Sequence, residues 1–384
     1  MKILLVSPST PNRFHRIRLQ HILDALSDEH EITGVFLQCA RTPFESPSSK
    51  KDYVFVKPKI VCLLDCLFQL PLPWPLEVSY TSYPPLKRLV SQLAPSHDII
   101  LVKRVRAAQF ISHRVSTPVI LDATDAMSLY YKKAAQSMGF WKNPLFVEEW
   151  LKYLVYEKRL GSRFTHWVVS SPTDASHLEH ILPAKASVTV IPNVVDTTYY
   201  QSYKKPILPK RILFSGLLDK YVNKSAIDFF LSFIYPSIRK EYPDVFVDIV
   251  GPNPSSRLFS LHDSHITVTG IVSDIRDYIS QSSVVIAPIT VGTGTRNKIL
   301  QAWSHERSVV STTIGAQGLG AEHGKHLFLA DEPKLFASFV VELLKDDPLA
   351  QKIARQGHSF VEQHFSLSVM REKYNMLLKK VKNE

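Results

Sequence analysis

The sequence predicts an α/β protein built from two doubly wound, Rossmann-like domains that face each other across a central cleft. The chain opens with an apolar run over Lys2–Ser7, a helical pattern over Arg16–Leu26 and a second apolar run over Glu31–Gln38. This strand–helix–strand order is typical of a parallel sheet covered by helices. The same order starts again at Lys210–Ser215, after the polar, proline-bearing segment Gln201–Pro209. The second start predicts a second domain, and the segment before it predicts a linker.

We therefore expect an N-terminal domain over residues 1–203, a C-terminal domain over 204–365, and a terminal helix over 366–384 that crosses back to the first domain. The 384 residues are 45% hydrophobic and 21% charged, which suits two folded cores. The formal net charge is +11 and is spread over both halves of the chain. This charge favours phosphorylated small molecules or an anionic membrane surface as partners, and no motif supports nucleic acid.

The three cysteines, Cys39, Cys62 and Cys66, predict core thiols in a reducing compartment rather than a metal site, because no histidine-rich segment accompanies them. The first apolar run ends at Ser7-Pro8, which is too short for a signal peptide. We expect a cytoplasmic protein, either soluble or bound peripherally to the inner face of the membrane.

Further strands and helices follow in alternation along both predicted domains. In the first, strands are expected at Asp52–Val56, Asp98–Val102, Thr117–Asp122, Thr165–Ser170 and Ser187–Ile191, and helices at Lys59–Gln69, Leu86–Ala94, Met127–Trp141 and Pro144–Gly161. In the second, strands are expected at Val245–Val250, Ile266–Gly270, Val284–Pro288, Ser308–Thr312 and Leu327–Leu329, and helices at Ser225–Lys240, Ile275–Ser280, Glu332–Lys345, Pro348–His364 and Leu367–Val381.

The segment 70–85, LPLPWPLEVSYTSYPP, follows the apolar helix Lys59–Gln69 and is rich in proline and aromatic residues. Two interpretations stay open. The segment could form a surface patch that meets lipid or a hydrophobic acceptor, or it could pack into the core.

Two features predict a ligand site. Residues Gly292–Arg296 form a glycine-bearing loop between a strand and a helix, where free N–H groups and the helix dipole favour phosphate. Lys298 adds a charge, although an ordinary turn and a solvated arginine would explain the same residues. Asp122 ends a predicted parallel strand and Asp125 follows it, at the end of the sheet where side chains face the ligand crevice. Asp125 could equally cap the next helix.

A set of short motifs resembles the retaining glycosyltransferases of the GT-B fold, of the family 4 or group 1 type that acts in bacterial surface-polysaccharide synthesis. The motifs are I-P-N-V-V-D (191–196), F-S-G (214–216), V-G-P-N-P (250–254), V-T-G (268–270), G-T-G-T-R-N-K-I-L-Q-A (292–302), V-V-S-T (309–312) and G-A-Q-G-L (315–319).

The resemblance implies transfer of a hexose-type sugar from a nucleotide-diphosphate sugar to a glycan or lipid-linked acceptor, with no metal or other cofactor. The donor would meet residues of the C-terminal domain: Gly216, Lys220, Asn223, Gly251, Gly292, Thr293, Gly294, Thr295, Arg296, Lys298 and Gln301. Catalytic candidates are Asp122, Asp125 and Arg296, and acceptor-side candidates are Arg13, His15, Arg104 and Arg106.

The chain departs from the family pattern at Gln301, where the family usually carries a glutamate that holds the ribose. Thr293 and Gln317 also stand where the family often has glutamate. These departures keep two alternatives open: a catalytically inactive GT-B module that binds a glycan or a partner protein, and a nucleotide-sugar epimerase.

Overall fold

The computed structural model describes residues 1–384 except 12–16, 40–50, 70–72, 139–143, 204 and 292–296. The chain forms two compact units. Unit 1 consists of Met1–Pro192 with Leu367–Glu384, and unit 2 of Asn193–Ser366. The domain limits expected from the sequence, at 203/204 and 365/366, and the expected cleft stay predictions.

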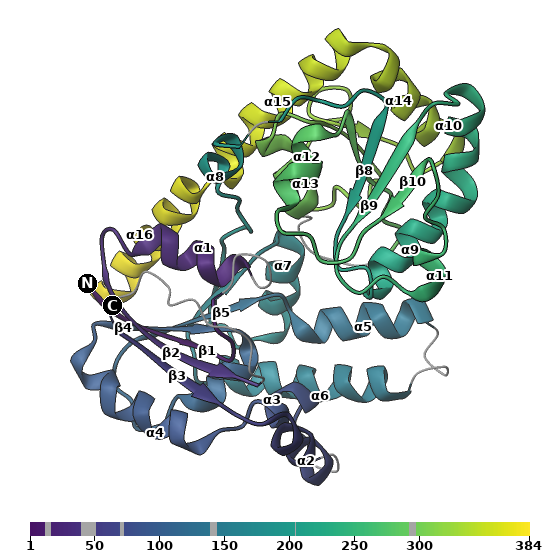
Figure 1. The fold of residues 1–384 in the computed structure, drawn as a ribbon. Coiled ribbons are helices and arrows are strands. Elements are labelled where there is room, and N and C mark those ends of the chain that lie inside the picture. Colours follow the sequence, from purple (N-terminus) through teal and green to yellow (C-terminus); the bar gives the residue numbers. More distant parts are fainter. Residues whose placement is uncertain (12–16, 40–50, 70–72, 139–143, 204, 292–296) are drawn as a thin grey trace. The chain divides into compact units, whose positions relative to one another are not determined.

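Unit 1 contains a seven-stranded parallel sheet in the order β3-β2-β1-β4-β5-β6-β7 (Figure 1). Its strand order reverses between β1 and β4, so the switch point of the sheet lies there. The strands are β1 (Lys2–Ser7), β2 (Glu31–Gln38), β3 (Lys51–Val56), β4 (Ile99–Lys103), β5 (Val119–Thr124), β6 (His166–Val169) and β7 (Ser187–Val190). The continuous apolar sequence of β1 fits its central position between β2 and β4, where consecutive residues, which point to opposite faces of the sheet, are buried.

The helices of unit 1 fall close to the predicted ranges. They are α1 (Ile17–Leu26), α2 (Lys59–Gln69), α3 (Leu76–Tyr80), α4 (Pro84–Leu93), α5 (Met127–Met138), α6 (Pro144–Gly161), α7 (Pro172–Ile181) and α16 (Leu367–Asn383), with 3₁₀ turns η1 (Ala94–Ser96) and η2 (Val105–Phe110). The short helix α3 was not predicted. Pro75 precedes its first residue and fits a helix start, so the prolines limit this helix without preventing it.

Helix α16 packs against α1 within unit 1 (Figure 1). Its buried side chains recur at helical spacing: Met370, Tyr374, Leu377, Leu378 and Val381. Arg371 adds a polar contact, since its Nε donates to the backbone oxygen of Ala25 over 2.7 Å. The last helix of the chain therefore completes the unit that begins with the first strand.

Unit 2 contains a six-stranded parallel sheet in the order β10-β9-β8-β11-β12-β13, with its switch point between β8 and β11. The strands are β8 (Arg211–Ser215), β9 (Phe246–Val250), β10 (Ile266–Val268), β11 (Val284–Ala287), β12 (Ser308–Ser311) and β13 (Phe328–Leu329). The helices are α8 (Thr197–Gln201), α9 (Tyr221–Phe229), α10 (Tyr235–Glu241), α11 (Ser256–Phe259), α12 (Ile275–Gln281), α13 (Asn297–Ser304), α14 (Pro333–Lys345) and α15 (Asp347–Phe365).

The single helix predicted over Ser225–Lys240 is interrupted. A π-helical turn, η3 (Phe230–Ile234), separates α9 from α10. Pro236 sits in the first turn of α10 and has no backbone N–H to donate, so the regular hydrogen-bond pattern cannot run through it. The apolar stripe of the sequence is kept, because Ala226, Phe230 and Ile234 are buried.

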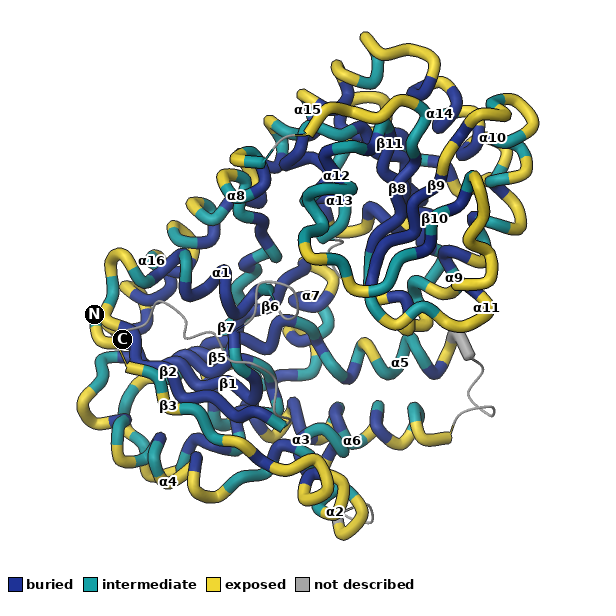
Figure 2. Tube along the Cα trace, viewed as in Figure 1, coloured by how far each residue is buried: buried dark blue, intermediate teal, exposed yellow. Residues whose placement is uncertain are grey.

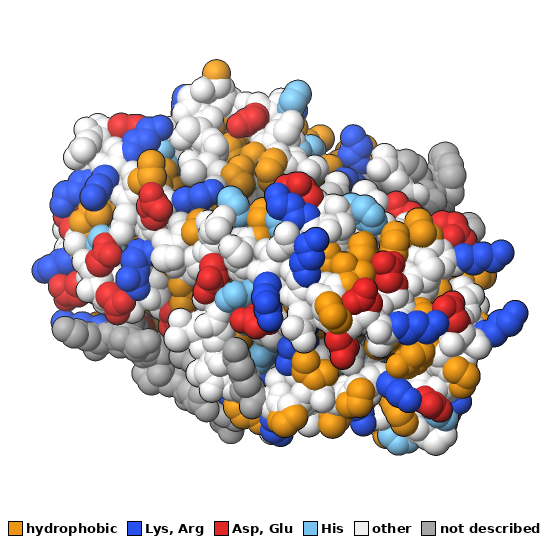
Figure 3. All heavy atoms as spheres, turned by 90° about the horizontal axis from the view of Figure 1, so that it is seen from above, with side chains coloured by type: hydrophobic (Ala, Val, Ile, Leu, Met, Phe, Trp, Pro, Cys, Tyr) orange, Lys and Arg blue, Asp and Glu red, His pale blue; other side chains and the backbone are white. Residues whose placement is uncertain are grey.

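Each unit has a core of its own on its sheet, and both sheets are buried while the outer sides of the helices are exposed (Figure 2). On the face drawn in Figure 3, basic and acidic side chains are interspersed without a large patch of either sign. Among the described residues, no helix is long and apolar enough to cross a membrane.

Candidate functional site

The exits of β8 and β9 lie next to the switch point of the unit 2 sheet. Gly216 follows β8 and Gly251 follows β9, with φ values of 153° and 154°. A Cβ atom on Gly251 would lie 1.8 Å from the backbone oxygen of Gly216. Gly251 needs glycine because its backbone lies against the backbone of Gly216, whereas a Cβ atom on Gly216 would lie 2.8 Å from the side-chain Nδ2 of Asn223.

Lys298 brings a positive charge to the same edge of the sheet. It lies in the first turn of α13, and its Nζ donates to Oδ1 of Asn223 over 3.2 Å. Its Nζ also lies 3.7 Å from the centre of the Phe214 ring, at the end of β8. Asn223 is fixed in turn, because its Nδ2 donates to the backbone oxygen of Leu217 over 2.8 Å. Three of the predicted donor residues, Gly216, Asn223 and Lys298, are thus neighbours.

Gln301 follows Lys298 by one helical turn and lies on the same side of α13. Its side chain hydrogen-bonds Tyr200, a buried residue of α8. Burial raises the pKa of the Tyr200 hydroxyl, and the bond from Gln301 opposes part of this rise. The amide that was expected to hold a ribose therefore already has a partner within unit 2. Its role toward a ribose stays a prediction.

Several predicted donor and acceptor residues lie outside the described part of the chain. These are Gly292, Thr293, Gly294, Thr295, Arg296, Arg13 and His15. Lys220 is described: it is exposed and stands at the N-cap of α9, where its backbone N–H donates to the oxygen of Leu217 over 3.2 Å.

In unit 1, a cluster of buried charged side chains lies near the carboxyl ends of β4 and β5. Asp122, at the end of β5, has no exposed surface and accepts from Arg18 Nε and Lys103 Nζ, each over 3.2 Å. The hydroxyl of Tyr374, on α16, donates to the same carboxylate. Burial alone would raise the pKa of Asp122, but the charges of Arg18 and Lys103 hold it well below its usual range. The catalytic role predicted for Asp122 stays untested, while its contacts make it the anchor of α1, β4 and α16.

Two residues beside this anchor have unusual backbone geometry. Arg104, after β4, has a φ of 73°, and Thr124, at the end of β5, has a φ of 71°. A positive φ is costly for a β-branched residue such as threonine. At Thr124 it coincides with a register shift between β5 and β6, and it turns the hydroxyl toward Lys103 Nζ.

Asp125 is the accessible carboxylate at this edge. Its side chain is one-third exposed and lies 3.3 Å from Arg104 Nη1. The predicted acceptor-side residue Arg106 points elsewhere: it binds Glu77 over 2.7 Å and holds α3 against η2. Arg104 and Asp125 are therefore the predicted unit 1 residues that the structure brings together on accessible surface.

Sequence reasoning missed two buried carboxylates that accept hydrogen bonds from backbone N–H groups at the start of α5. Glu157, on α6, accepts from the backbone N–H of Met127 over 2.8 Å, and Asp174, on α7, accepts from that of Ala126 over 3.0 Å. Burial raises the pKa of Glu157 to about 7, against the lowering effect of its hydrogen bonds with Ser128 and Met127. No local signal marks this pair, because each acid lies 30 residues or more from its partner in sequence.

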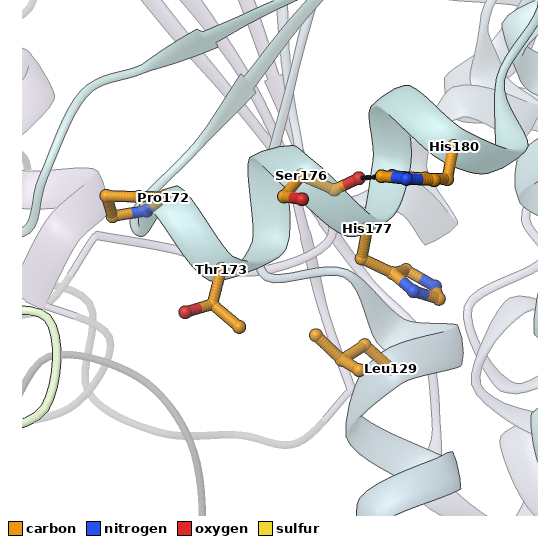
Figure 4. Close-up of a pocket in the computed structure, with 6 residues that line it drawn as sticks. All are labelled: Leu129, Pro172, Thr173, Ser176, His177 and His180. Carbon is orange, nitrogen blue, oxygen red and sulfur yellow. Dashed lines mark hydrogen bonds between the residues drawn. The ribbon is translucent and has the colours of Figure 1, made fainter.

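An open pocket lies between α5 and α7 in unit 1 (Figure 4). One of its lining residues is His177, whose Nε2 lies 2.7 Å from the hydroxyl of Ser128. Burial lowers the pKa of His177, which favours the neutral ring at pH 7. The lining residues are Leu129, Pro172, Thr173, Ser176, His177 and His180. Among the described residues, no cluster of three or more His, Cys, Asp or Glu side chains could hold a metal ion.

The site in unit 2 coincides with a match to a known family. Residues 209–346, which lie within unit 2, match the family model described as glycosyl transferases group 1. A segment of 163 residues is 28% identical to a 44.6 kDa protein in the cps region of Klebsiella pneumoniae. The alignment covers 40% of this chain and 42% of that protein, so it spans less than half of the relative.

Solved structures resemble nearly the whole chain. HepE of Anabaena in complex with UDP and glucose has a TM-score of 0.69 at 16% identity, over 99% of this chain and 100% of that one. Sucrose-phosphate synthase from Thermosynechococcus elongatus has a TM-score of 0.70 at 14% identity, over 99% of both chains. A trehalose-phosphate synthase (UDP-forming) from Burkholderia vietnamiensis has a TM-score of 0.68 at 12% identity, over 99% and 100%. These likenesses confirm the predicted GT-B fold class.

Proposed function

We propose that the protein is a glycosyltransferase that moves a hexose-type sugar from a nucleotide-diphosphate sugar to a glycan or lipid-linked acceptor. The observation that carries the proposal is the fixed cation of Lys298 beside the glycine exits Gly216 and Gly251, at the switch point of the unit 2 sheet. Ligands of open α/β sheets bind at such points.

The chemistry required at this site is stabilisation of a departing diphosphate. As the bond between the sugar and the diphosphate breaks, negative charge grows on the leaving group, and a preorganised cation lowers the barrier. Lys298 suits this role because Asn223 and the Phe214 ring hold its ammonium group in place. The glycines allow the diphosphate to approach the backbone closely. The expected retention of anomeric configuration comes from the family resemblance and belongs to the same proposal.

The comparisons support this proposal at the level of chemistry. HepE was crystallised with UDP, and the trehalose-phosphate synthase is named as UDP-forming. A nucleotide-diphosphate sugar is thus a reasonable donor for this chain. The cps-region relative favours a role in surface-polysaccharide assembly.

The test is binding of a panel of nucleotide-diphosphate sugars, followed by thermal unfolding of the purified protein. A true donor should raise the melting temperature by a few degrees at saturating concentration. Lys298→Ala should remove this shift, and Lys240→Ala, which changes an exposed lysine of α10, should keep it. If no donor stabilises the folded protein, or if both variants behave alike, the proposal is wrong.

Gln301 favours a second candidate, a GT-B module that binds a nucleotide sugar or glycan without turnover. Its amide is engaged with Tyr200 and lacks the charge of a carboxylate. Product analysis separates the candidates: transfer consumes the donor only with an acceptor, epimerisation changes it without one, and an inactive module leaves it intact in both cases.

A further inference from the structure

Helix α2 of unit 1 turns its apolar side toward solvent (Figure 2). Six large hydrophobic side chains on it are between 40% and 77% exposed: Ile60, Val61, Leu63, Leu64, Leu67 and Phe68. At about 100° per residue they cover an arc of roughly 160°. A surface helix ordinarily buries such a stripe, so this exposure is the reverse of the usual arrangement.

Polar contacts hold α2 in this orientation. Its opposite side carries the buried Cys62 and the half-buried Asp65 and Cys66. Asp65 receives the buried ammonium group of Lys57 over 2.6 Å, and Lys57 also donates to the backbone oxygens of Tyr80 and Ser82. The apolar face is therefore fixed outward by the fold.

Further exposed apolar side chains lie on α6 and just before α3, the helix that α2 contacts. Trp74, which precedes α3, is 38% exposed, with its ring centre 5.9 Å from the guanidinium carbon of Arg159 on α6. Leu151 and Val155 are exposed on α6 and precede Arg159 at four-residue spacing, so the three share one stripe. We call α2, Trp74 and this stripe the docking face.

The charges around the docking face are of one sign. Its nearby carboxylates are neutralised: Asp65 by Lys57, Glu77 by Arg106 and Glu148 by Lys152, with nitrogen–oxygen distances of 2.6–2.7 Å. Three cations are exposed and have no carboxylate partner within the described part of the chain. They are Lys59, Lys158 and Arg159.

We propose that the docking face binds the surface of an anionic phospholipid bilayer, with α2 lying in the plane of the membrane interface. Exposed apolar side chains next to unpaired cations are the chemistry that such a surface recognises. A tryptophan beside an arginine suits the headgroup level, where one side of the ring is apolar and the other is wet. A second copy of the chain fits less well, because two-fold pairing would bring the same cations together.

This docking face belongs to unit 1, whereas the proposed donor site belongs to unit 2. The inference therefore goes beyond the proposed function and can be tested without any sugar. Membrane binding and donor binding can fail separately.

The experiment is cosedimentation of the full chain with vesicles of phosphatidylglycerol and phosphatidylethanolamine, compared with phosphatidylcholine vesicles. We expect binding to the anionic vesicles that weakens as salt is raised. The double variant Leu67→Ser/Phe68→Ser should partition at least tenfold more weakly. The matched control Phe233→Ser/Ile271→Ser changes two equally exposed residues of unit 2 and should stay within twofold of the wild type.

A charge variant tests the second half of the proposal. Lys59→Gln/Lys158→Gln/Arg159→Gln should lose the preference for anionic vesicles, whereas Lys240→Gln/Lys334→Gln/Lys352→Gln, with the same charge change in unit 2, should keep it. Circular dichroism checks that each variant is folded; because the changed side chains are exposed, we expect native spectra.

Four results would overturn the proposal. They are absence of vesicle binding by the folded wild type, equal binding to phosphatidylcholine, unchanged binding by Leu67→Ser/Phe68→Ser, and a stable dimer in sedimentation velocity that this variant dissociates. The last result would assign the face to a second copy of the chain.

Discussion

Under the proposed function, individual side chains determine how tightly the unit 2 site binds a nucleotide. Lys298 and Asn223 are prearranged at the switch point, but Gln301 offers a neutral amide that Tyr200 already uses. A hydrogen bond from a ribose hydroxyl to a carboxylate is stronger than one to an amide. The residue that limits donor affinity should therefore be Gln301.

Gln301→Glu should tighten binding of the donor or of its nucleoside diphosphate. Two charge-assisted bonds to a ribose would add roughly 1–2 kcal/mol, or about a five- to thirtyfold lower Kd. Tyr200 can keep its partner, because its hydroxyl can donate to the new carboxylate. Isothermal titration calorimetry measures the change. Unchanged or weaker binding would mean that Gln301 does not face the ribose.

Glu157 makes the stability of unit 1 depend on pH. Its pKa is raised to about 7 in the folded state, so the folded state holds this proton more tightly than the unfolded chain does. The stability that it contributes is present below about pH 4.5 and is lost as the pH rises toward about 7. Asp174, whose pKa burial also raises, acts in the same direction.

Glu157→Gln isolates this contribution. The difference in unfolding free energy between wild type and variant should shift by roughly 3 kcal/mol between pH 4.5 and pH 7.5, in favour of the wild type at the acid end. Urea denaturation at several pH values measures it. Glu179→Gln, at an exposed position of α7, is the control and should give a flat difference. A flat difference for both would show that folding does not raise the pKa of Glu157.

The sequence predicted the parts of the site that depend on local pattern. Gly216 and Gly251 follow predicted strands and Lys298 opens a predicted helix, so the apolar and polar pattern placed them at the ends of elements. The family resemblance then assigned them to a donor site. Glu157 and Tyr374 could not be found this way. Their partners lie 30 and 252 residues away, and only the folded chain brings them together.

At the scale of elements, α16 is tied to the first sheet by one buried hydroxyl. Tyr374 donates to Asp122, which already balances Arg18 and Lys103 in a buried site. A donor removed from a buried charge is costly, because no water replaces it. The periodicity of the sequence predicted this helix but not which charge it meets, just as it predicted one helix where Pro236 makes a π-helical turn.

Tyr374→Phe should destabilise unit 1 by about 1.5–3 kcal/mol, since it removes the donor and keeps the ring. Met376→Ala changes an exposed residue of the same helix and should cost little. Urea unfolding of the full chain compares them. Equal effects of the two substitutions would show that the Tyr374 hydroxyl contributes nothing to the anchor.

At the scale of the whole molecule, the two units differ in continuity. Unit 2 is one continuous segment, whereas unit 1 is built from two segments, one before unit 2 in the sequence and one after it. The chain enters unit 2 at Asn193 and leaves it at Ser366, and these two ends of unit 2 are neighbours. Val195 and Ser366 form a backbone bridge, and the N–H of Val195 donates to the backbone oxygen of Phe365 over 2.8 Å. This connectivity depends on which of the two cores each helix joins. The hydrophobic pattern of a helix shows which of its sides is buried but does not identify the core against which that side packs.

Residues 193–366 produced alone should fold cooperatively and bind the nucleoside diphosphate within about threefold of the full chain's Kd. Residues 1–192 alone should be unstable, because they lose Tyr374 and the apolar face of α16. Joining 1–192 to 367–384 through a short Gly/Ser linker should restore a cooperative transition. Calorimetry and thermal unfolding provide the readout. A stable 1–192 fragment would contradict the role given to α16.

Helix α16 also fixes an order of events during synthesis. Because the ribosome makes residues 367–384 after residues 193–366, the second unit can close while the first still lacks its last helix. The carboxylate of Asp122 therefore lacks its tyrosine donor until residues 367–384 have been made. We therefore expect the core of unit 1 to stay incomplete for longer during synthesis than the core of unit 2.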